Sequence, residues 1–138
     1  MLNTGYLLMQ VAKDLRYELN QALIKSDLTI QQWAVLEQIS LLTKTTQNTA
    51  NLISKNLDMD KPTISGISKR LVVKELIQKV PNPADKRSQL LTLTENGQTA
   101  LKLGQKISDQ VLQKHLETLT ATEQQQLQST LKKINGDF

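Results

Sequence analysis

The sequence predicts a mainly α-helical protein of one domain that carries a single small β-hairpin. Apolar residues recur at three- and four-residue steps over most of the chain, which is typical of amphipathic helices. Two short runs with strand character, residues 76–80 and 90–94, follow each other closely in the second half. The length of 138 residues suits one domain, and no linker long enough to divide two domains is present.

The first two helices are predicted from periodicity and capping residues. Residues 5–26 repeat leucine, valine and alanine at helical spacing, and the segment after them breaks the pattern. Thr29 is a good N-cap, and Gln32 stands where a capping box requires a glutamine or glutamate. We therefore expect a second helix over residues 30–43.

A compact unit of two helices is predicted next. Either Asn48 or Thr49 can cap a short helix over residues 50–57, which the polar segment after it interrupts. Asp60 can then cap a further helix that runs to about Lys74 or Glu75. Its apolar stripe consists of Ile64, Ile67 and Leu71, with Val72 as a further candidate.

The hairpin and the last two helices complete the order of elements. The nine residues between the two strand candidates, 81–89, form a long exposed loop with two prolines. Thr94 caps a helix over residues 95–117, which Gly97 and Gly104 are expected to weaken locally. A final helix, with Thr120 as N-cap and Glu123 as its capping-box partner, should end near Asn135 and Gly136.

Positive charge is concentrated in the centre of the chain. Residues 55–87 hold eight basic and four acidic residues, whereas the rest of the chain is balanced, so this segment accounts for the whole net charge of +4. A local basic surface attracts polyanions such as nucleic acid or anionic lipid. The alternative is a solvated helix face followed by a charged turn.

Composition excludes several classes of function. The chain has no cysteine, which removes disulfides, zinc–thiolate sites and thiol-based sensing. The one histidine, His115, lies on a terminal helix and is better explained as a surface or interface residue than as a base. There is no glycine-rich phosphate loop, metal cluster or apolar run that could span a bilayer. We therefore expect a cytoplasmic protein without catalytic residues, cofactor, metal or membrane partner.

The helix after Asp60 has the features of a DNA-reading helix. Such a helix needs an apolar back that holds it and a polar front with short side chains near its N-terminus. Hydroxyl groups can contact base edges or phosphates, and lysine and arginine neutralise phosphates. The alternative is an ordinary amphipathic helix with a solvated face. The candidate contact residues are Lys61, Pro62, Thr63, Ser65, Gly66, Lys69 and Arg70.

The loop of the hairpin adds a second candidate contact. A hairpin that directly follows a reading helix can flank the groove, and a basic residue at its tip can reach the minor groove. Arg87 is such a residue, Lys86 stands beside it, and Asp85 could pair with the Arg87 guanidinium and fix its direction. The alternative is a solvated charged turn. A basic helix front followed at once by a basic hairpin tip is rarer than either feature alone.

The chain resembles the MarR family of bacterial transcription regulators. "ANLISKNLDMDKPTISGISKRL" resembles the family's supporting helix, turn and recognition helix. "LIQKVPNPADKRSQLLTLTENG" resembles its wing, with Asp85 and Arg87 as the Asp-x-Arg element, and "LTIQQWAVLEQI" resembles the second helix. Two positions depart from the common pattern, namely Asn82, where many members have aspartate, and Lys86, where arginine is common.

The resemblance implies a winged helix-turn-helix fold and a homodimer. Residues 28–97 would form the DNA-binding region, and residues 1–27 and 98–138 the helical dimerisation region of one domain over residues 1–138. The resemblance further implies a repressor of a pseudo-palindromic operator in double-stranded DNA, which a small aromatic or phenolic effector releases. The ligand-binding residues, the operator and the choice between repression and activation stay open. The rival reading is a winged-helix architectural or protein-interaction module without sequence-specific readout.

Overall fold

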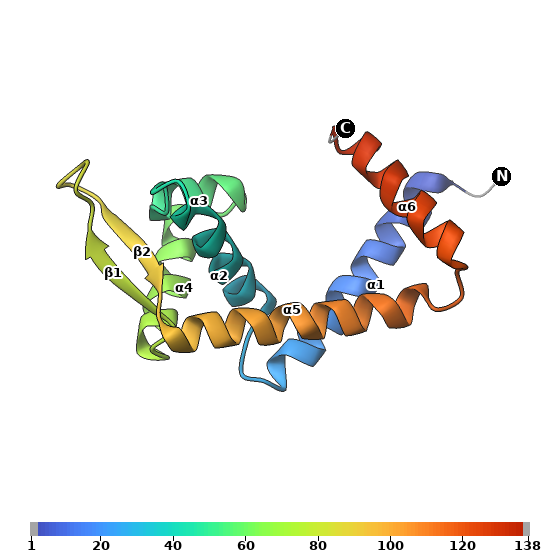
Figure 1. Ribbon diagram of the computed structural model, residues 1–138, viewed down its shortest axis with the longest axis horizontal. Helices are drawn as coiled ribbons and strands as arrows, with labels where there is room; N and C mark the ends of the chain where they lie inside the picture. The colour runs from blue at the N-terminus through green and yellow to red at the C-terminus, as the bar shows by residue number, and fades with distance from the viewer. Residues whose placement is uncertain (1–2, 137–138) are drawn as a thin grey trace.

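The computed structural model describes residues 3–136 as six helices and one two-stranded antiparallel hairpin. Figure 1 shows two groups of elements joined by one long helix, α5. One group, here called the head, contains the hairpin and three helices, and the other, here called the arm, contains the remaining helices and both termini. The head consists of α2 (Ile30–Thr43), α3 (Ala50–Asn56), α4 (Lys61–Val73), β1 (Ile77–Pro81) and β2 (Gln89–Leu93). The arm consists of α1 (Thr4–Ile24), the C-terminal part of α5 (Glu95–Leu116) and α6 (Ala121–Ile134).

The N-terminal caps predicted from the sequence are confirmed. The Thr29 side chain accepts a hydrogen bond from the Gln32 N–H at 3.0 Å, and the Gln32 side chain accepts one from the Thr29 N–H at 3.2 Å. Thr120 and Glu123 form the same reciprocal pair at the start of α6. Thr94 is the N-cap of α5, as the sequence predicted. Each cap satisfies backbone donors that a helix start leaves unpaired.

Four helices end in a tight turn in which a residue other than glycine adopts a positive φ. In each turn the next N–H donates to a carbonyl five residues back, as Leu28 does to Leu23 at 3.2 Å and Leu76 does to Leu71 at 2.9 Å. Such turns end helices because they satisfy carbonyls that lack a partner in the last helical turn. The residues with positive φ are Asp27 (57°), Thr46 (55°), Asp58 (52°) and Glu75 (61°).

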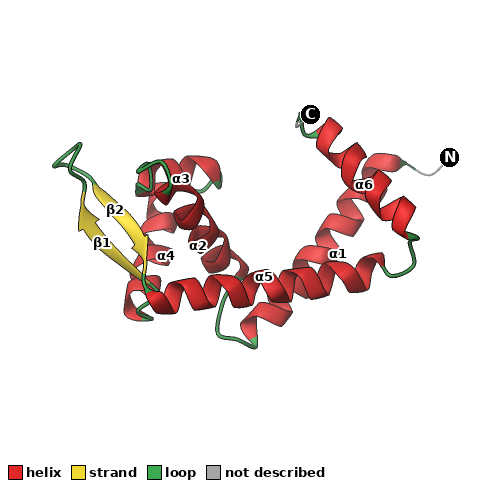
Figure 2. Ribbon diagram, viewed as in Figure 1, coloured by secondary structure: helices red, strands yellow, loops and turns green. Residues whose placement is uncertain are grey.

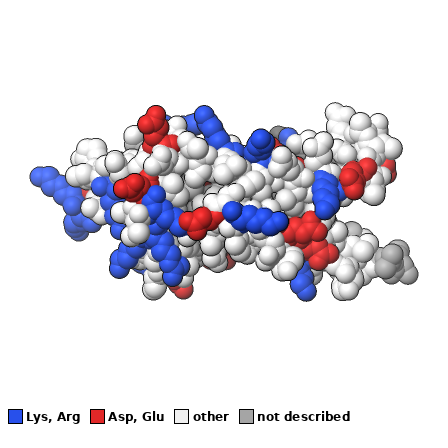
Figure 3. All heavy atoms as spheres, turned by 90° about the horizontal axis from the view of Figure 1, so that it is seen from below, with Lys and Arg blue, Asp and Glu red and all other residues white. Residues whose placement is uncertain are grey.

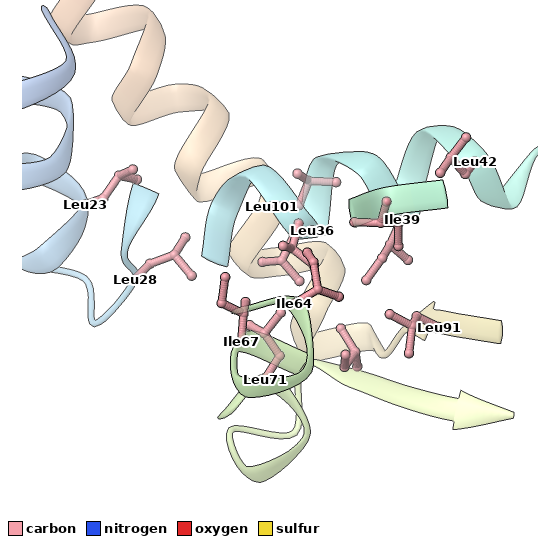
Figure 4. Close-up of a cluster of buried hydrophobic side chains, with 13 residues drawn as sticks. Leu23, Leu28, Leu36, Ile39, Leu42, Ile64, Ile67, Leu71, Leu91 and Leu101 are labelled. Carbon is pink, nitrogen blue, oxygen red and sulfur yellow. The ribbon is translucent and has the colours of Figure 1, made fainter. Parts of the chain in front are cut away.

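The core lies inside the head and extends along α5. Figure 4 shows Leu36, Ile64, Ile67 and Leu71 converging from α2 and α4 on a common centre. The apolar stripe predicted for α4 is thus confirmed, whereas Val72 is exposed and does not belong to it. The remaining core residues come from α2 itself and from the elements around this centre, and they are Leu23, Leu28, Val35, Ile39, Leu42, Ile53, Ile77, Leu91 and Leu101.

The glycines of α5 are contact points with the head, which corrects the expectation that they only weaken the helix. A Cβ atom on Gly104 would lie 2.3 Å from Trp33 Cδ1, and one on Gly97 would lie 1.9 Å from the Leu76 carbonyl oxygen. The Trp33 indole N–H also donates to the Leu101 carbonyl at 3.4 Å. These close approaches fix where α5 lies against α2 and against the turn between α4 and β1.

The hairpin differs in detail from the sequence prediction. The first strand begins one residue later than predicted, at Ile77, and the second begins one residue earlier, at Gln89. The two strands pair from Ile77 with Leu93 to Pro81 with Gln89. The loop between the strands therefore has residues 82–88 rather than nine residues. Pro81 fits at the end of a strand, where no N–H is needed for the ladder. Helix ends agree with the predictions to within two residues, which is the usual uncertainty of helix boundaries.

Replacing Gly104 with alanine should reduce stability. The added methyl group would clash with the Trp33 ring, and such overpacking costs about 1–3 kcal/mol. Gly66→Ala is the matched control, because no atom lies within 4 Å of its Cβ position and glycine is a poor helix former. Urea unfolding should show a less stable Gly104→Ala protein and an unchanged or more stable Gly66→Ala protein. Equal stabilities would contradict the close approach.

Candidate nucleic-acid interface

Helix α4 presents a polar face outward because its apolar stripe is held in the core. Asp60 is its N-cap, and the Thr63 N–H donates to the Asp60 carboxylate at 2.8 Å. Pro62 lies in the first turn, where its missing N–H removes no helical hydrogen bond. Ile64, Ile67 and Ser68 are buried, and most of the other side chains of the first three turns face solvent. The exposed set is Lys61, Pro62, Thr63, Ser65, Lys69 and Arg70, and Gly66 is half-buried.

The cap of α4 also determines the charge state at its first turn. Hydrogen bonds from Thr63, first from its side chain and then from its backbone, hold the pKa of Asp60 below its usual value of 3.8. The carboxylate therefore stays ionised at neutral pH, at the end of the helix where the helix dipole favours a negative charge.

The tip of the hairpin is an ordered turn built from its own side chains. Asn82 accepts a hydrogen bond from the Ala84 N–H at 3.0 Å and donates to the Ser88 hydroxyl at 2.9 Å, so it joins the two ends of the loop. Asp85 accepts from the Arg87 N–H at 3.0 Å, and its carboxylate lies 3.6 Å from Arg87 Nε. The pairing predicted between these two side chains is confirmed.

The Arg87 side chain remains 95% exposed despite this pairing. An ion pair this exposed adds little to stability, so its structural effect is to restrict the direction of the guanidinium. Lys86 and Asp85 are also exposed at the tip. Figure 3 shows lysine and arginine side chains most densely gathered at the end of the molecule that carries the head and hairpin.

A groove of about 400 Å³ joins the two parts of the candidate site. It lies between α3, α4 and the hairpin, and it brings Lys61 and Ser65 of α4 to the same hollow as Arg87 of the loop. The other predicted residues do not line this groove; Gly66 is half-buried, and Pro62, Thr63, Lys69, Arg70, Asp85 and Lys86 are exposed outside it. Its floor includes the Ser68 hydroxyl, which is buried and has no hydrogen-bond partner in the described part of the chain.

Three exposed polar residues in the groove were not among the site residues predicted from the sequence. Lys79 extends from β1, Gln89 from β2 and Asn51 from the first turn of α3, and all three are exposed. Lys79 belongs to the basic segment of residues 55–87, but it stands two residues after the buried Ile77 and so shares a strand face with it; alternation alone would not have placed it in an exposed groove. No local signal pointed to Asn51 or Gln89, since their positions depend on how the hairpin packs against α3.

Asn48 attaches the hairpin to the helices of the head. Its side-chain amide donates to the Leu91 carbonyl at 2.7 Å, and its own carbonyl accepts from the Leu91 N–H at 2.8 Å. Thr49 next to it makes a bridge to Leu90 and also caps α3. Of the two capping candidates, Thr49 is therefore the cap, and the buried Asn48 holds β2 against the segment before α3.

Within residues 3–136, no group of three or more histidine, aspartate or glutamate side chains could hold a metal ion. None of the helices in that range has both the length and the apolar character that crossing a bilayer requires.

The family of this chain follows from comparison with known proteins. The multiple antibiotic resistance protein MarR of Escherichia coli is 32% identical to it over 117 residues, which cover 84% of this chain and 79% of that protein. A sequence model of the MarR family matches residues 28–89. The chain belongs to the MarR family.

Solved structures of MarR-family proteins share the whole architecture. The crystal structure of apo MarR from E. coli has a TM-score of 0.86 at 30% identity and covers 97% of both chains. A variant of the same protein, complexed with operator DNA, has a TM-score of 0.77 at 30% identity and covers 94% of this chain and 91% of that one. The predicted fold class, a winged helix-turn-helix flanked by further helices, is confirmed. In the terms of this fold, the hairpin is the wing, and α4 stands in the place of the predicted recognition helix.

Replacing Asn48 with alanine should loosen the wing. The change leaves the Leu91 carbonyl without its side-chain donor, which costs about 1–3 kcal/mol for a buried polar group. Asn51→Ala, an exposed asparagine of α3, is the matched control for stability. Urea unfolding and amide exchange at Leu91 should separate the two variants. Identical stability and exchange would show that the Asn48 side chain does not hold β2.

Replacing Asp60 with asparagine should make α4 less sensitive to acid. Because the folded-state pKa of Asp60 is lowered, its contribution to stability is complete above about pH 4 and is lost as the pH falls through the lowered value. Asparagine keeps a good N-cap acceptor but does not titrate. The variant should therefore lose less stability than the wild type between about pH 5 and pH 2.5. Asp109→Asn, an exposed change on α5, is the control, and equal acid losses for all three proteins would contradict the prediction.

Proposed function

We propose that this protein is a homodimeric transcription regulator that binds a specific pseudo-palindromic site in double-stranded DNA. The observation that supports this most strongly is the groove, where the polar front of α4 and the arginine of the wing meet on one exposed side of the head. A helix enters the major groove, and a basic tip beside it reaches the neighbouring minor groove. Membership of a family with a member solved on operator DNA agrees with this function.

The residues of the site divide by chemistry. Thr63 and Ser65 are short, exposed and near the N-terminus of α4, where base edges come closest to a reading helix. Gly66 leaves open space in which DNA can approach the backbone. The lysine and arginine side chains contact phosphates, and these contacts position the protein on the duplex without reading its sequence. The side chains are Lys61, Lys69 and Arg70 of α4 with Lys86 and Arg87 of the wing, and Pro62 and Asp85 shape the two ends of the site.

Dimerisation is proposed from apolar surface that one chain leaves uncovered. Helix α6 has no buried residue, although Leu127, Leu131 and Ile134 recur along it at helical spacing. The N-terminal part of α1 exposes a similar set, with Tyr6 61% and Met9 75% exposed. Figure 1 shows both helices at the end of the molecule away from the wing. A second copy of the chain would cover them and place two heads on one duplex, so residues 1–27 and 98–138 form the dimerisation region.

Two heads related by a two-fold axis would meet half-sites about one helical turn apart, roughly 34–36 Å. A dimer bound to such a site blocks access of other proteins to the promoter, and we therefore propose that the protein is a repressor. Because its target is DNA, we also propose that it acts in the cytoplasm. A small aromatic or phenolic effector could release it only by binding better to a dimer whose heads are spaced differently. A winged-helix module that binds duplex DNA through charge alone is the second candidate, because most of the exposed cations would serve either function.

Selection from a random duplex library at about 150 mM salt, with anisotropy on the enriched sequences, tests the proposal. Enrichment of a pseudo-palindrome supports a dimeric, sequence-specific regulator. Salt-sensitive binding without an enriched motif would favour the charge-only module, and absence of any binding would overturn both.

Removal of the hydroxyl groups of α4 should reduce discrimination between sequences. Thr63→Ala and Ser65→Ala should each weaken binding to the selected duplex by about 1–3 kcal/mol and leave binding to random duplex nearly unchanged. Asn51→Ala is the control for Ser65, because both residues line the groove and Asn51 extends from α3; it shows whether loss of any polar group in the groove has the same effect. Equal losses on both duplexes would remove Thr63 and Ser65 from base reading.

Removal of the wing arginine should weaken binding to all duplexes. Arg87→Ala should lower affinity for selected and random sequences alike and reduce the salt slope by about one ion. Lys106→Ala, an exposed cation on α5, is the charge-matched control, since it changes net charge by the same amount outside the head. An unchanged affinity and slope for Arg87→Ala would place Arg87 outside the interface.

A further inference from the structure

Lys74 connects the recognition helix to the start of the arm. It is the C-cap of α4, and its ammonium group donates to the Asp27 carbonyl at 2.5 Å and to the Gln32 side-chain oxygen at 3.0 Å. The Asp27 carboxylate lies 3.6 Å from the same nitrogen. One side chain therefore contacts the turn that ends α1 and the first turn of α2, in addition to the helix from which it extends.

The turn that Lys74 contacts is fixed to α1. Asp27 adopts a positive φ of 57°, and the Asp27 and Leu28 N–H groups donate back to Ile24 and Leu23. Leu23 and Leu28 are both buried, so the turn cannot move without disturbing the core. A contact made to the Asp27 carbonyl is therefore a contact made to the end of α1.

The second acceptor is equally constrained. Gln32 is buried and its side-chain oxygen accepts from the Thr29 N–H as well as from Lys74, so the capping box of α2 and the end of α4 share one atom. The Lys74 side chain is only 26% exposed, whereas the Asp27 side chain is 92% exposed. The exposed ion pair contributes little, and the hydrogen bonds to the two neutral oxygens hold the ammonium group in place.

This contact acts on the direction in which α4 points. Lys74 lies at the end of α4 opposite to Thr63 and Ser65, so it can fix the tilt of the helix relative to α1 without touching the candidate DNA-binding face. In a two-fold dimer, α1 belongs to the shared platform, and any change of tilt moves both recognition helices symmetrically. Such a change alters the distance between the half-sites that the two helices can reach together.

We propose that Lys74 is a positioning residue that sets the half-site spacing this regulator accepts, by tying the C-terminal end of α4 to the α1–α2 turn. The inference rests on the proposed dimeric function. It assigns to Lys74 no contact with DNA, so loss of the side chain should change which spacing is bound best and leave the number of phosphate contacts unchanged.

A series of operators that differ only in the spacing of their two half-sites tests the proposal. The selected duplex is prepared with its two half-sites at the natural spacing and with one or two base pairs added or removed between them. The wild type and Lys74→Met are titrated on each duplex by anisotropy. Methionine keeps an unbranched apolar stem of similar length but removes the charge and the donors. The ratio of affinities between natural and altered spacings should fall about three- to tenfold in Lys74→Met, as expected when a coupling contact is lost.

Three further variants make the result specific. Lys74→Arg can still donate to both oxygens and should keep the wild-type ratio. Asp27→Gly favours the positive φ and keeps the carbonyl acceptor, so it too should change the ratio little. Lys44→Met is the matched control, because Lys44 is the exposed C-cap of α2 before an equivalent turn, and its side chain has no hydrogen bond or ion pair within residues 3–136. Lys74→Gln, whose shorter amide cannot span the same distance, replaces Lys74→Met if circular dichroism shows that the latter does not fold.

The outcomes separate this inference from the proposed function. A Lys74→Met protein that loses the same factor at every spacing, or whose salt slope falls by about one ion, would overturn the positioning role in favour of instability or a phosphate contact. A wild-type spacing preference that Lys74→Met retains in full would also overturn it and leave the proposed function intact. A wild type without any spacing preference would contradict the two-half-site function itself, and the inference with it.

Discussion

The position of the head depends on how one helix, α5, is seated. Gly97 lies against the backbone at Leu76, and Gly104 lies against the Trp33 ring, so the N-terminal half of α5 is held at two points by contacts too close for any side chain. Just before both glycines, the Thr94 hydroxyl donates to the Glu75 carbonyl at 2.6 Å and the Thr94 N–H donates to the Leu76 carbonyl at 3.0 Å. The C-terminal half of the same helix packs against α1 (Figure 1). Any rotation of the head relative to the arm must therefore bend α5 or break the close contacts at Gly97 and Gly104.

The proposed DNA-binding surface reduces the stability of the fold little, because it consists of residues that the core does not include. The stripe of α4 that includes Ile64 and Leu71 holds the helix in place, and the turn around Asn82 and Asp85 closes on its own hydrogen bonds. The exposed cations are thus available to a polyanion without loss of internal contacts. The buried Ser68 hydroxyl, which has no partner among the described residues, is the one polar atom below this surface whose hydrogen bond the folded chain does not supply.

The parts of the fold that could be predicted from the sequence are those that depend on neighbouring residues. The capping boxes at Thr29 and Thr120 involve residues three positions apart, and the α4 stripe follows from helical spacing. The parts that could not be predicted join distant segments. The roles of Gly104, Asn48 and Lys74 require a partner 71, 43 and 47 residues away in the chain, and no local pattern identifies such a partner.

The same distinction applies to the candidate site. The residues of α4 and the wing tip were identified because charge and short polar side chains cluster in sequence, and the Asp85–Arg87 pair lies within one turn. Asn51 and Gln89 line the same groove because the Asn48 hydrogen bond holds β2 against the segment before α3. The sequence thus indicates which chemistry the surface offers, whereas the long-range contacts determine its shape.

Hydroxyl-radical footprinting of the wild-type protein on its selected duplex tests the central claim most directly, because it shows where two heads held on one platform contact the backbone. Two symmetric protected patches on one face of the duplex, with centres about 10–10.5 base pairs apart, are the result this account predicts. A single protected patch, or uniform protection along the duplex without a helical period, would contradict two paired DNA-binding heads. Either result would favour a module that binds duplex DNA through charge alone.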